Sequence, residues 1–318
     1  MKIKKLIVTT SFIVLAATTT FSITDATSRE MTKIVIQENK DNISTNLPII
    51  AHRGFSSISI ENSKEALELG FNAIYTDGVE IDIRLTKDEK IILSHNDEIN
   101  NKKISTTTLE ELKNETITLD NNISLYLGSL LDTKSGNLIR ERLKLIKDKQ
   151  TKPITLDDAL DIHNNYNDKI LIIEIKYDER DKNIFNELIY STLQKHHKNN
   201  IIIQSSDYDA LIDMKTKYPD LEYHLVTNEN NYDKIQKKDL DGYVIRKNLI
   251  DYDVVKELIN ENKKVSVWTI NNYDEYQKTS SILKDLNTQV YYITDYPDAL
   301  RTWHNINEKN NPKQKVKR

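Results

Sequence analysis

The chain has 318 residues, with 45 basic and 49 acidic side chains and a formal net charge of −4. This balance excludes the strongly basic profile of a nucleic-acid-binding protein, and the length suits one large domain or two ordinary ones. No cysteine is present, which excludes disulfides, thiolate metal sites and cysteine nucleophiles.

The first 26 residues have the pattern of a signal peptide. Lys2, Lys4 and Lys5 precede an apolar run from Leu6 to Ala17, and small polar residues follow. The run is short for a membrane span of about 20 residues, although an uncleaved anchor is the alternative. We therefore expect a signal peptide at 1–26, a polar leader at 27–46, and a secreted or extracellular protein. For the basic tail, 305–318, we favour a solvated segment, with contact to an anionic surface as the alternative.

The stretch from Pro48 to Asp97 carries the strongest pattern. A strand at 48–52 ends in His52-Arg53-Gly54 and is followed by a helix, for which Asn62 is the expected N-cap and Gly70 the expected end. Strands at 79–85 and 91–95 come next, and the last of them ends in Ser94-His95.

The strand at 79–85 alternates apolar and acidic residues, which places Glu80 and Asp82 on one face. Two adjacent carboxylates require a cation or a shared proton when they are buried. The alternative is a strand edge that faces solvent.

The rest of the chain alternates helices and strands. A short helix is expected at 107–113, and an insertion at 114–150 contains a helix at 137–147. The expected helices that follow are 156–165, 182–196, 207–217, 231–237, 250–261, 273–285 and one from Asp295 onward. The strands between them are 169–176, 200–205, 221–227, 241–246, 264–270 and 289–294.

This alternation predicts an α/β fold with a parallel sheet. Counting from Pro48, eight strand units predict a (β/α)8 TIM barrel over 47–304, with a small insertion after the second strand region. A doubly wound open sheet is the alternative, but the chain lacks the Gly-rich first turn that is typical of it.

In such a barrel the catalytic groups lie at the carboxyl ends of the strands. The residues found at or near these ends are His52, His95, Glu174, Ser205, Trp268 and Asp295. Glu174 shares a face with Lys176, so the two could form a structural ion pair. If Glu174 instead faces Glu80 and Asp82, the three carboxylates suit Ca²⁺ or Mg²⁺. Histidines suit acid–base catalysis near neutral pH, and Arg53 suits a phosphate group.

These motifs together resemble the glycerophosphodiester phosphodiesterase family, in its secreted bacterial form. The set is HRG, ENS, ExD, a strand that ends in histidine, and EIK. Residues 153–156, 267–271 and 293–297 extend the resemblance, which covers about 48–302.

The resemblance implies hydrolysis of a glycerophosphodiester to an alcohol and sn-glycerol 3-phosphate, with a divalent cation, Ca²⁺ or Mg²⁺. By position, the implied metal ligands are Glu80, Asp82, Glu174 and Glu61. His52 and His95 match the acid–base pair, and the implied substrate contacts are Arg53, Lys176 and Trp268.

Two departures from the family pattern stand out. Ser63 replaces a threonine, and Asn96 follows His95 where the family has an aspartate. The altered loop around His95 favours one alternative, an inactive surface-binding barrel. The other alternative is a phospholipase-type lyase that acts on intact or lyso lipids, because such enzymes also use two histidines. The expected partner is a small glycerophosphodiester, with a lysolipid or a glycerol-phosphate wall polymer as further candidates. We expect neither nucleic acid nor an obligate protein partner.

Overall fold

The strands form a closed barrel, and their side chains point alternately into the barrel and toward the surrounding helices. The computed structural model describes residues 47–118, 142, 145–180, 182–196 and 200–310. The eight parallel strands are β1 (Ile49–His52), β2 (Gly78–Leu85), β8 (Ile170–Ile175), β9 (Ile201–Ser205), β10 (Glu222–Val226), β11 (Gly242–Arg246), β12 (Lys264–Trp268) and β13 (Val290–Thr294). Their spatial order is β1-β13-β12-β11-β10-β9-β8-β2, and β2 pairs with β1 to close the ring. The TIM-barrel prediction is confirmed.

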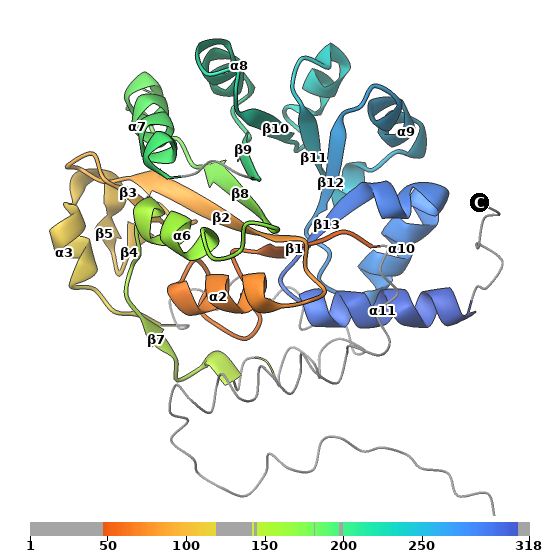
Figure 1. The fold of residues 1–318 in the computed structure, drawn as a ribbon, viewed down its shortest axis with the longest axis horizontal. Helices are drawn as coiled ribbons and strands as arrows, with labels where there is room; N and C mark the ends of the chain where they lie inside the picture. The colour runs from red at the N-terminus through yellow and green to blue at the C-terminus, as the bar shows by residue number, and fades with distance from the viewer. Residues whose placement is uncertain (1–46, 119–141, 143–144, 181, 197–199, 311–318) are drawn as a thin grey trace, which may run out of the picture. The chain divides into compact units, whose positions relative to one another are not determined.

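Each barrel strand is followed by helical structure packed on the outside of the barrel (Figure 1). These elements are α2 (Lys64–Asn72), α6 (Leu156–His163), α7 (Lys182–Lys195), α8 (Tyr208–Lys217), the 3₁₀ segment η5 (Tyr232–Lys237), α9 (Tyr252–Asn260), α10 (Tyr273–Leu283) and α11 (Pro297–Asn310). The 3₁₀ turns η6 (Lys247–Leu249) and η7 (Lys284–Gln289) lead into α9 and β13. The helix expected at 231–237 is therefore a 3₁₀ segment.

The barrel buries two apolar layers. Inside it, one residue from each of six strands forms a small cluster: Ile50, Ile172, Ile202, Val226, Val244 and Ile293. The neighbouring residues of these strands face the helices and join a larger cluster. On β2, Val79, Ile81 and Ile83 belong to the outer cluster, so Glu80 and Asp82 point inward. The predicted orientation of this strand is therefore correct.

Two details of α2 differ from the prediction. Ser63, not Asn62, is the N-cap, because its hydroxyl accepts a hydrogen bond from the Ala66 amide. The helix also continues past Gly70 to Asn72. A Cβ at Gly70 would lie 2.7 Å from Val79 Cγ2, so this glycine allows close contact with β2 rather than ending the helix.

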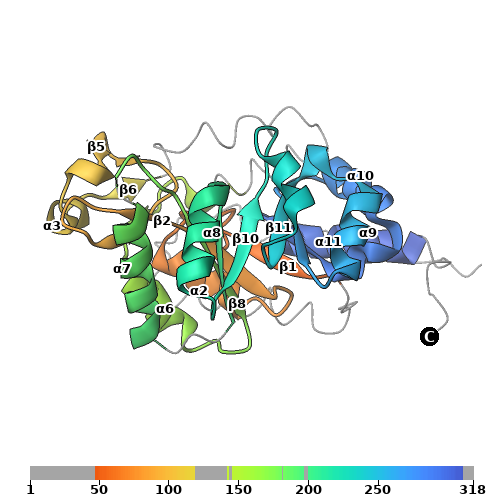
Figure 2. The same ribbon diagram turned by 90° about the horizontal axis from the view of Figure 1, so that it is seen from above.

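Residues 91–118 form a separate segment beside β2, which we call the β3–β6 segment. It contains β3 (Ile91–Leu93), the hairpin β4 (Glu98–Ile99) and β5 (Lys102–Lys103), η2 (Ile104–Thr106), α3 (Leu109–Lys113) and β6 (Ile117–Thr118), which pairs with β7 (Gln150–Thr151). Figures 1 and 2 both place it away from α9 and α10.

The strand expected at 91–95 is two residues too long. β3 runs antiparallel to the end of β2, and the Ser94 hydroxyl turns the chain by donating to the Asn96 carbonyl. Most of the helix predicted at 137–147, like most of the insertion, lies outside the described residues. Within the described ranges, no helix is long and apolar enough to cross a membrane.

Candidate active site

Strand register brings the acidic residues together at the carboxyl end of the barrel. His52 of β1 is paired with Glu80 of β2, and Asp82 of β2 with Glu174 of β8. Gln204 of β9 continues the second row, and its amide donates to Glu174 Oε2 at 3.2 Å. Residues from four strands therefore meet at one point.

The Glu80, Asp82 and Glu174 carboxylates each place an oxygen within 4.8 Å of the others. Glu80 and Asp82 are each only 1% exposed, and Glu80 Oε1 is buried without a hydrogen-bond partner among the described residues. Three carboxylates with an unpartnered oxygen are the donor set that hard cations such as Ca²⁺ and Mg²⁺ prefer. These residues therefore fit a divalent cation.

Two basic side chains bind the same carboxylates. Arg53 Nε lies 3.1 Å from Asp82 Oδ2, and Lys176 Nζ lies 3.1 Å from Asp82 Oδ1 and also contacts Glu174. Burial alone would raise the pKa of Asp82, but these two cations outweigh it and hold the pKa well below its usual range. Burial and the neighbouring Asp82 raise the pKa of Glu80. The site thus contains excess negative charge that a divalent cation would neutralise.

His52 is held by an aspartate that the sequence analysis did not assign to the site. Its Nδ1 lies 2.6 Å from Asp295 Oδ1, and its Nε2 lies 3.9 Å from Glu80 Oε2. Asn271 Nδ2 donates to the other Asp295 oxygen at 2.5 Å, and the Ser56 hydroxyl donates to Oδ1. Burial and Arg53 lower the pKa of His52, but Asp295 and Glu80 raise it more, so the net shift is upward.

His95 has a different environment. It lies in the turn after β3, and its Nδ1 lies 3.1 Å from the Asn96 side-chain oxygen, so a neutral amide holds this ring. Burial and the positive charge of Arg53 lower the pKa of His95 to about 4. Asn96 therefore supplies a hydrogen bond to the ring without a charge.

Asn62 has a role that differs from the predicted helix cap. Its φ is +54°, and its side chain donates to Asp82 Oδ2 and accepts from the Asp82 backbone amide, both at 3.0 Å. Arg53 also has a positive φ, 56°, and its amide donates to Glu80 Oε2. The loop between β1 and α2 thus orients two of the three carboxylates.

Glu61 and Trp268 lie at the edges of the site. Glu61 accepts a hydrogen bond from Arg53 at 2.9 Å and is not one of the three clustered carboxylates, so its role as a metal ligand stays a prediction. Trp268 ends β12 and packs on the inner apolar cluster. Its indole Nε1 is buried and has no hydrogen-bond partner in the described part of the chain.

Comparison with known proteins assigns this arrangement to a family. The sequence profile of the glycerophosphoryl diester phosphodiesterase family matches residues 52–299, which is most of the chain. The chain belongs to the glycerophosphoryl diester phosphodiesterase family. The resemblance seen in the sequence motifs and the predicted enzyme class, a phosphoric diester hydrolase, are confirmed.

The individual relatives have low sequence identity to this chain. YhdW of Bacillus subtilis (strain 168), provisionally named a glycerophosphodiester phosphodiesterase, is 26% identical over 268 residues, 79% of this chain and 96% of YhdW. The uncharacterized protein MG293 of Mycoplasma genitalium is 29% identical over 158 residues, 46% of this chain and 61% of that protein. A phosphodiesterase from Oleispira antarctica, solved with the product sn-glycerol-3-phosphate, aligns with a TM-score of 0.61 at 22% identity, over 82% of this chain and 98% of that one.

Proposed function

We propose that this protein hydrolyses small glycerophosphodiesters to an alcohol and sn-glycerol 3-phosphate, and that it needs a divalent cation. Family membership supports the reaction. The observation that carries the mechanism is the placement of His52, His95, Arg53 and Lys176 around the Glu80–Asp82–Glu174 cluster. Bound sn-glycerol-3-phosphate in the Oleispira antarctica protein supports the same product.

Ground-state binding uses the charged residues of the site. Glu80, Asp82 and Glu174 would hold Ca²⁺ or Mg²⁺, which when bound neutralises charge on the phosphoryl oxygens. Arg53 and Lys176 supply fixed positive charge beside the same position, and the planar guanidinium of Arg53 matches a phosphate. Trp268 offers an apolar surface to the glycerol part of the substrate.

The two histidines divide the proton transfers. Since Asp295 faces His52 Nδ1, the proton of the neutral ring lies on Nδ1, and Nε2 can accept a proton. His52 takes the proton of the attacking hydroxyl as the new P–O bond forms. The departing alcohol oxygen takes a proton as the old P–O bond breaks, and a protonated His95 would supply it. The pKa of His95 is about 4 without substrate, and the anionic phosphodiester would raise it and favour the protonated ring. The attacking hydroxyl comes from water or from the glycerol of the substrate, and the second route gives a cyclic phosphate first.

The test is release of sn-glycerol 3-phosphate from glycerophosphocholine and glycerophosphoglycerol by the purified protein. The assay includes Ca²⁺, Mg²⁺ or chelator, beside His52→Ala and an exposed control, Glu89→Gln. We expect metal-dependent release that His52→Ala abolishes and Glu89→Gln retains.

Three other outcomes would reject parts of the proposal. A cyclic phosphate as the final product would identify a lyase. Binding of a divalent ion without hydrolysis of either diester would point to a lipid or a glycerol-phosphate polymer as substrate. A folded protein that neither binds an ion nor hydrolyses any diester would be an inactive binding barrel.

We also propose that the protein is exported. The basic and then apolar pattern of residues 1–26 supports this. Fusion of these residues to a reporter enzyme that is active only outside the cytoplasm tests it. A fusion that stays inside the cell would reject export.

A further inference from the structure

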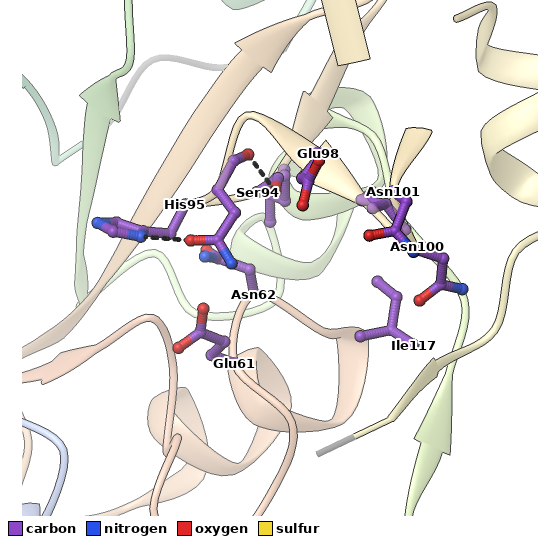
Figure 3. A pocket seen from close by; sticks show the side chains of 11 residues that line it. Glu61, Asn62, Ser94, His95, Glu98, Asn100, Asn101 and Ile117 are labelled. Atoms are coloured by element: carbon purple, nitrogen blue, oxygen red, sulfur yellow. Dashed lines mark hydrogen bonds between the residues drawn. The ribbon is translucent and has the colours of Figure 1, made fainter. Parts of the chain in front are cut away.

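A cavity adjoins the active site on one side. It has a volume of about 170 Å³ and lies between the barrel and the β3–β6 segment. Figure 3 shows His95 and Glu61 on one side of it and Asn100, Asn101 and Ile117 on the other. The cavity is thus built partly by the catalytic loop regions and partly by the segment that departs from the simple barrel.

Direct contacts connect this cavity to the catalytic residues. Of its lining residues, Glu61 accepts a hydrogen bond from Arg53, and Asn62 donates to Asp82. His95 lies at the boundary, whereas His52 and Trp268 are not part of the lining. A phosphodiester centred between the histidines would therefore place one of its two ester groups in this cavity, on the side of His95.

The lining is polar and lacks two common recognition groups. The Asn101 amide can donate and accept hydrogen bonds, as hydroxyl groups of a ligand require. The side-chain oxygens of Ser94 and Asn100 can accept them, although the hydrogens of these two side chains are already donated within the protein. No aromatic residue occurs among the described residues of the lining, so a quaternary ammonium would find no aromatic cage. No lysine or arginine occurs there either, and Glu98 adds negative charge, which disfavours an anionic group.

We propose that this cavity receives the departing alcohol and favours a small, uncharged, polyhydroxylated head group such as glycerol or inositol. The inference rests on the proposed function and adds a head-group preference to it. The volume is below the roughly 300–1,000 Å³ of pockets for drug-sized ligands, which fits one small polyol. The polyol could belong to a free diester or to the end of a glycerol-phosphate polymer.

Asn101 is the residue that tests this preference most cleanly. Asn100 and Asn101 form the two-residue turn between β4 and β5, with φ values of +50° and +63°. Asn100 also has a structural role, since its amide donates to Glu115 Oε2 and to the Thr116 carbonyl. Glycine adopts positive φ without strain, so Asn101→Gly removes an amide from the cavity and keeps the turn.

The experiment compares kcat/KM for glycerophosphoglycerol and glycerophosphoinositol with kcat/KM for glycerophosphocholine. In Asn101→Gly we expect the polyol-to-choline ratio to fall about threefold to tenfold, as loss of one neutral hydrogen bond implies. Asn262→Gly is the matched control, because Asn262 is exposed, has a φ of +59° and lies in the turn before β12. Its ratio should equal that of the wild type. A glycerol-phosphate polymer, assayed in parallel, distinguishes a chain end from a free diester.

Two outcomes would overturn the inference. Wild-type kcat/KM values for all diesters in Asn101→Gly would show that the cavity does not recognise the head group. An equal loss for all diesters would show that it binds the shared glycerol phosphate. If the wild type hydrolyses no diester, the proposed function is rejected. The head-group inference is then tested by binding measurements alone. Tighter binding of uncleaved glycerophosphoglycerol to wild type than to Asn101→Gly would support it, and equal affinities would reject it.

Discussion

The barrel has a histidine–carboxylate–lysine group at each end, and the two groups differ in how far their charges are satisfied. At the amino end, Glu222 Oε1 lies 2.7 Å from His224 Nε2, and Glu222 Oε2 lies 2.8 Å from Lys264 Nζ. His224 is fully buried, and a Cβ at Gly242 would lie 2.5 Å from its ring. Both oxygens of this carboxylate therefore have partners, and the histidine is enclosed.

At the carboxyl end of the barrel, not every carboxylate oxygen has a partner among the described residues. Glu80 uses one oxygen for the Arg53 amide, and its other oxygen has no hydrogen-bond partner within the described residues. Two permanent cations, Arg53 and Lys176, contact the acidic cluster, and its carboxylates lie close together. Residue types alone do not distinguish a catalytic group from a structural one. The two ends differ in whether every carboxylate oxygen already has a hydrogen-bond or ion-pair partner within the described part of the protein.

The strongest test removes the charge of Glu80 at the carboxyl end of the barrel. Glu80→Gln should lower kcat/KM by about 100-fold to 1,000-fold, as removal of a key electrostatic group does. Thermal unfolding in chelator should occur at the same or a higher temperature, because the variant removes repulsion with Asp82. Nearly full activity with a large drop in Tm would show that Glu80 is structural and would break the contrast between the two ends.

Asp295→Asn tests the proposed role of Asp295 at the carboxyl end of the barrel. The carboxylate raises the pKa of His52, so a neutral amide should lower that pKa, and kcat should fall about tenfold to 100-fold. NMR titration of the His52 ring in both proteins measures the shift. An unchanged or higher pKa in the variant would contradict this role for Asp295.

At the amino end the effect should be on stability alone. Burial would raise the pKa of Glu222, but His224 and Lys264 lower it to about 2. Since this lies below the ordinary value of 4.5, the unfolded chain takes up the proton first as the pH falls. The carboxylate should therefore stabilise the fold fully above pH 4.5 and lose this effect toward pH 2.

Glu222→Gln should consequently cost about 1–2 kcal/mol of unfolding free energy at neutral pH and little near pH 2. Denaturant unfolding at several pH values measures this, and kcat/KM should stay within about twofold of wild type. A large loss of activity in a protein that remains folded would contradict the structural role.

The smallest expected change concerns the two histidines of the active site. Asn96→Asp would give His95 the carboxylate partner that His52 already has, so the pKa of His95 should rise from about 4 by about one unit. NMR titration of His95 measures it, with His52 as the internal reference. A pKa that does not move would show that Asn96 does not control the ring.

Much of the barrel was predictable because its signals are local. Alternation along β2 and the regular spacing of strands depend on neighbouring residues, and they correctly oriented Glu80 and Asp82. Contacts between residues far apart in the sequence could not be predicted from such local patterns. Asp295 was recognised at a strand end, but its pairing with His52 depends on closure of the barrel.

Loop geometry explains the other differences. Asn62 and Ser63 are both good N-cap residues, and only the positive φ of Asn62 decides that it turns toward Asp82 instead. Gly70 resembles a helix stop, but the close approach of α2 to β2 determines its use. The antiparallel direction of β3 follows from a tight turn with few distinctive residues.

The hydrogen bond between His52 and Asp295 joins residues 243 positions apart, one at the end of β1 and the other directly after β13. A chain emerging from the ribosome cannot make this contact until β13 has been synthesised and has docked beside β1. We therefore expect catalytic activity to appear only after β13 has paired with β1.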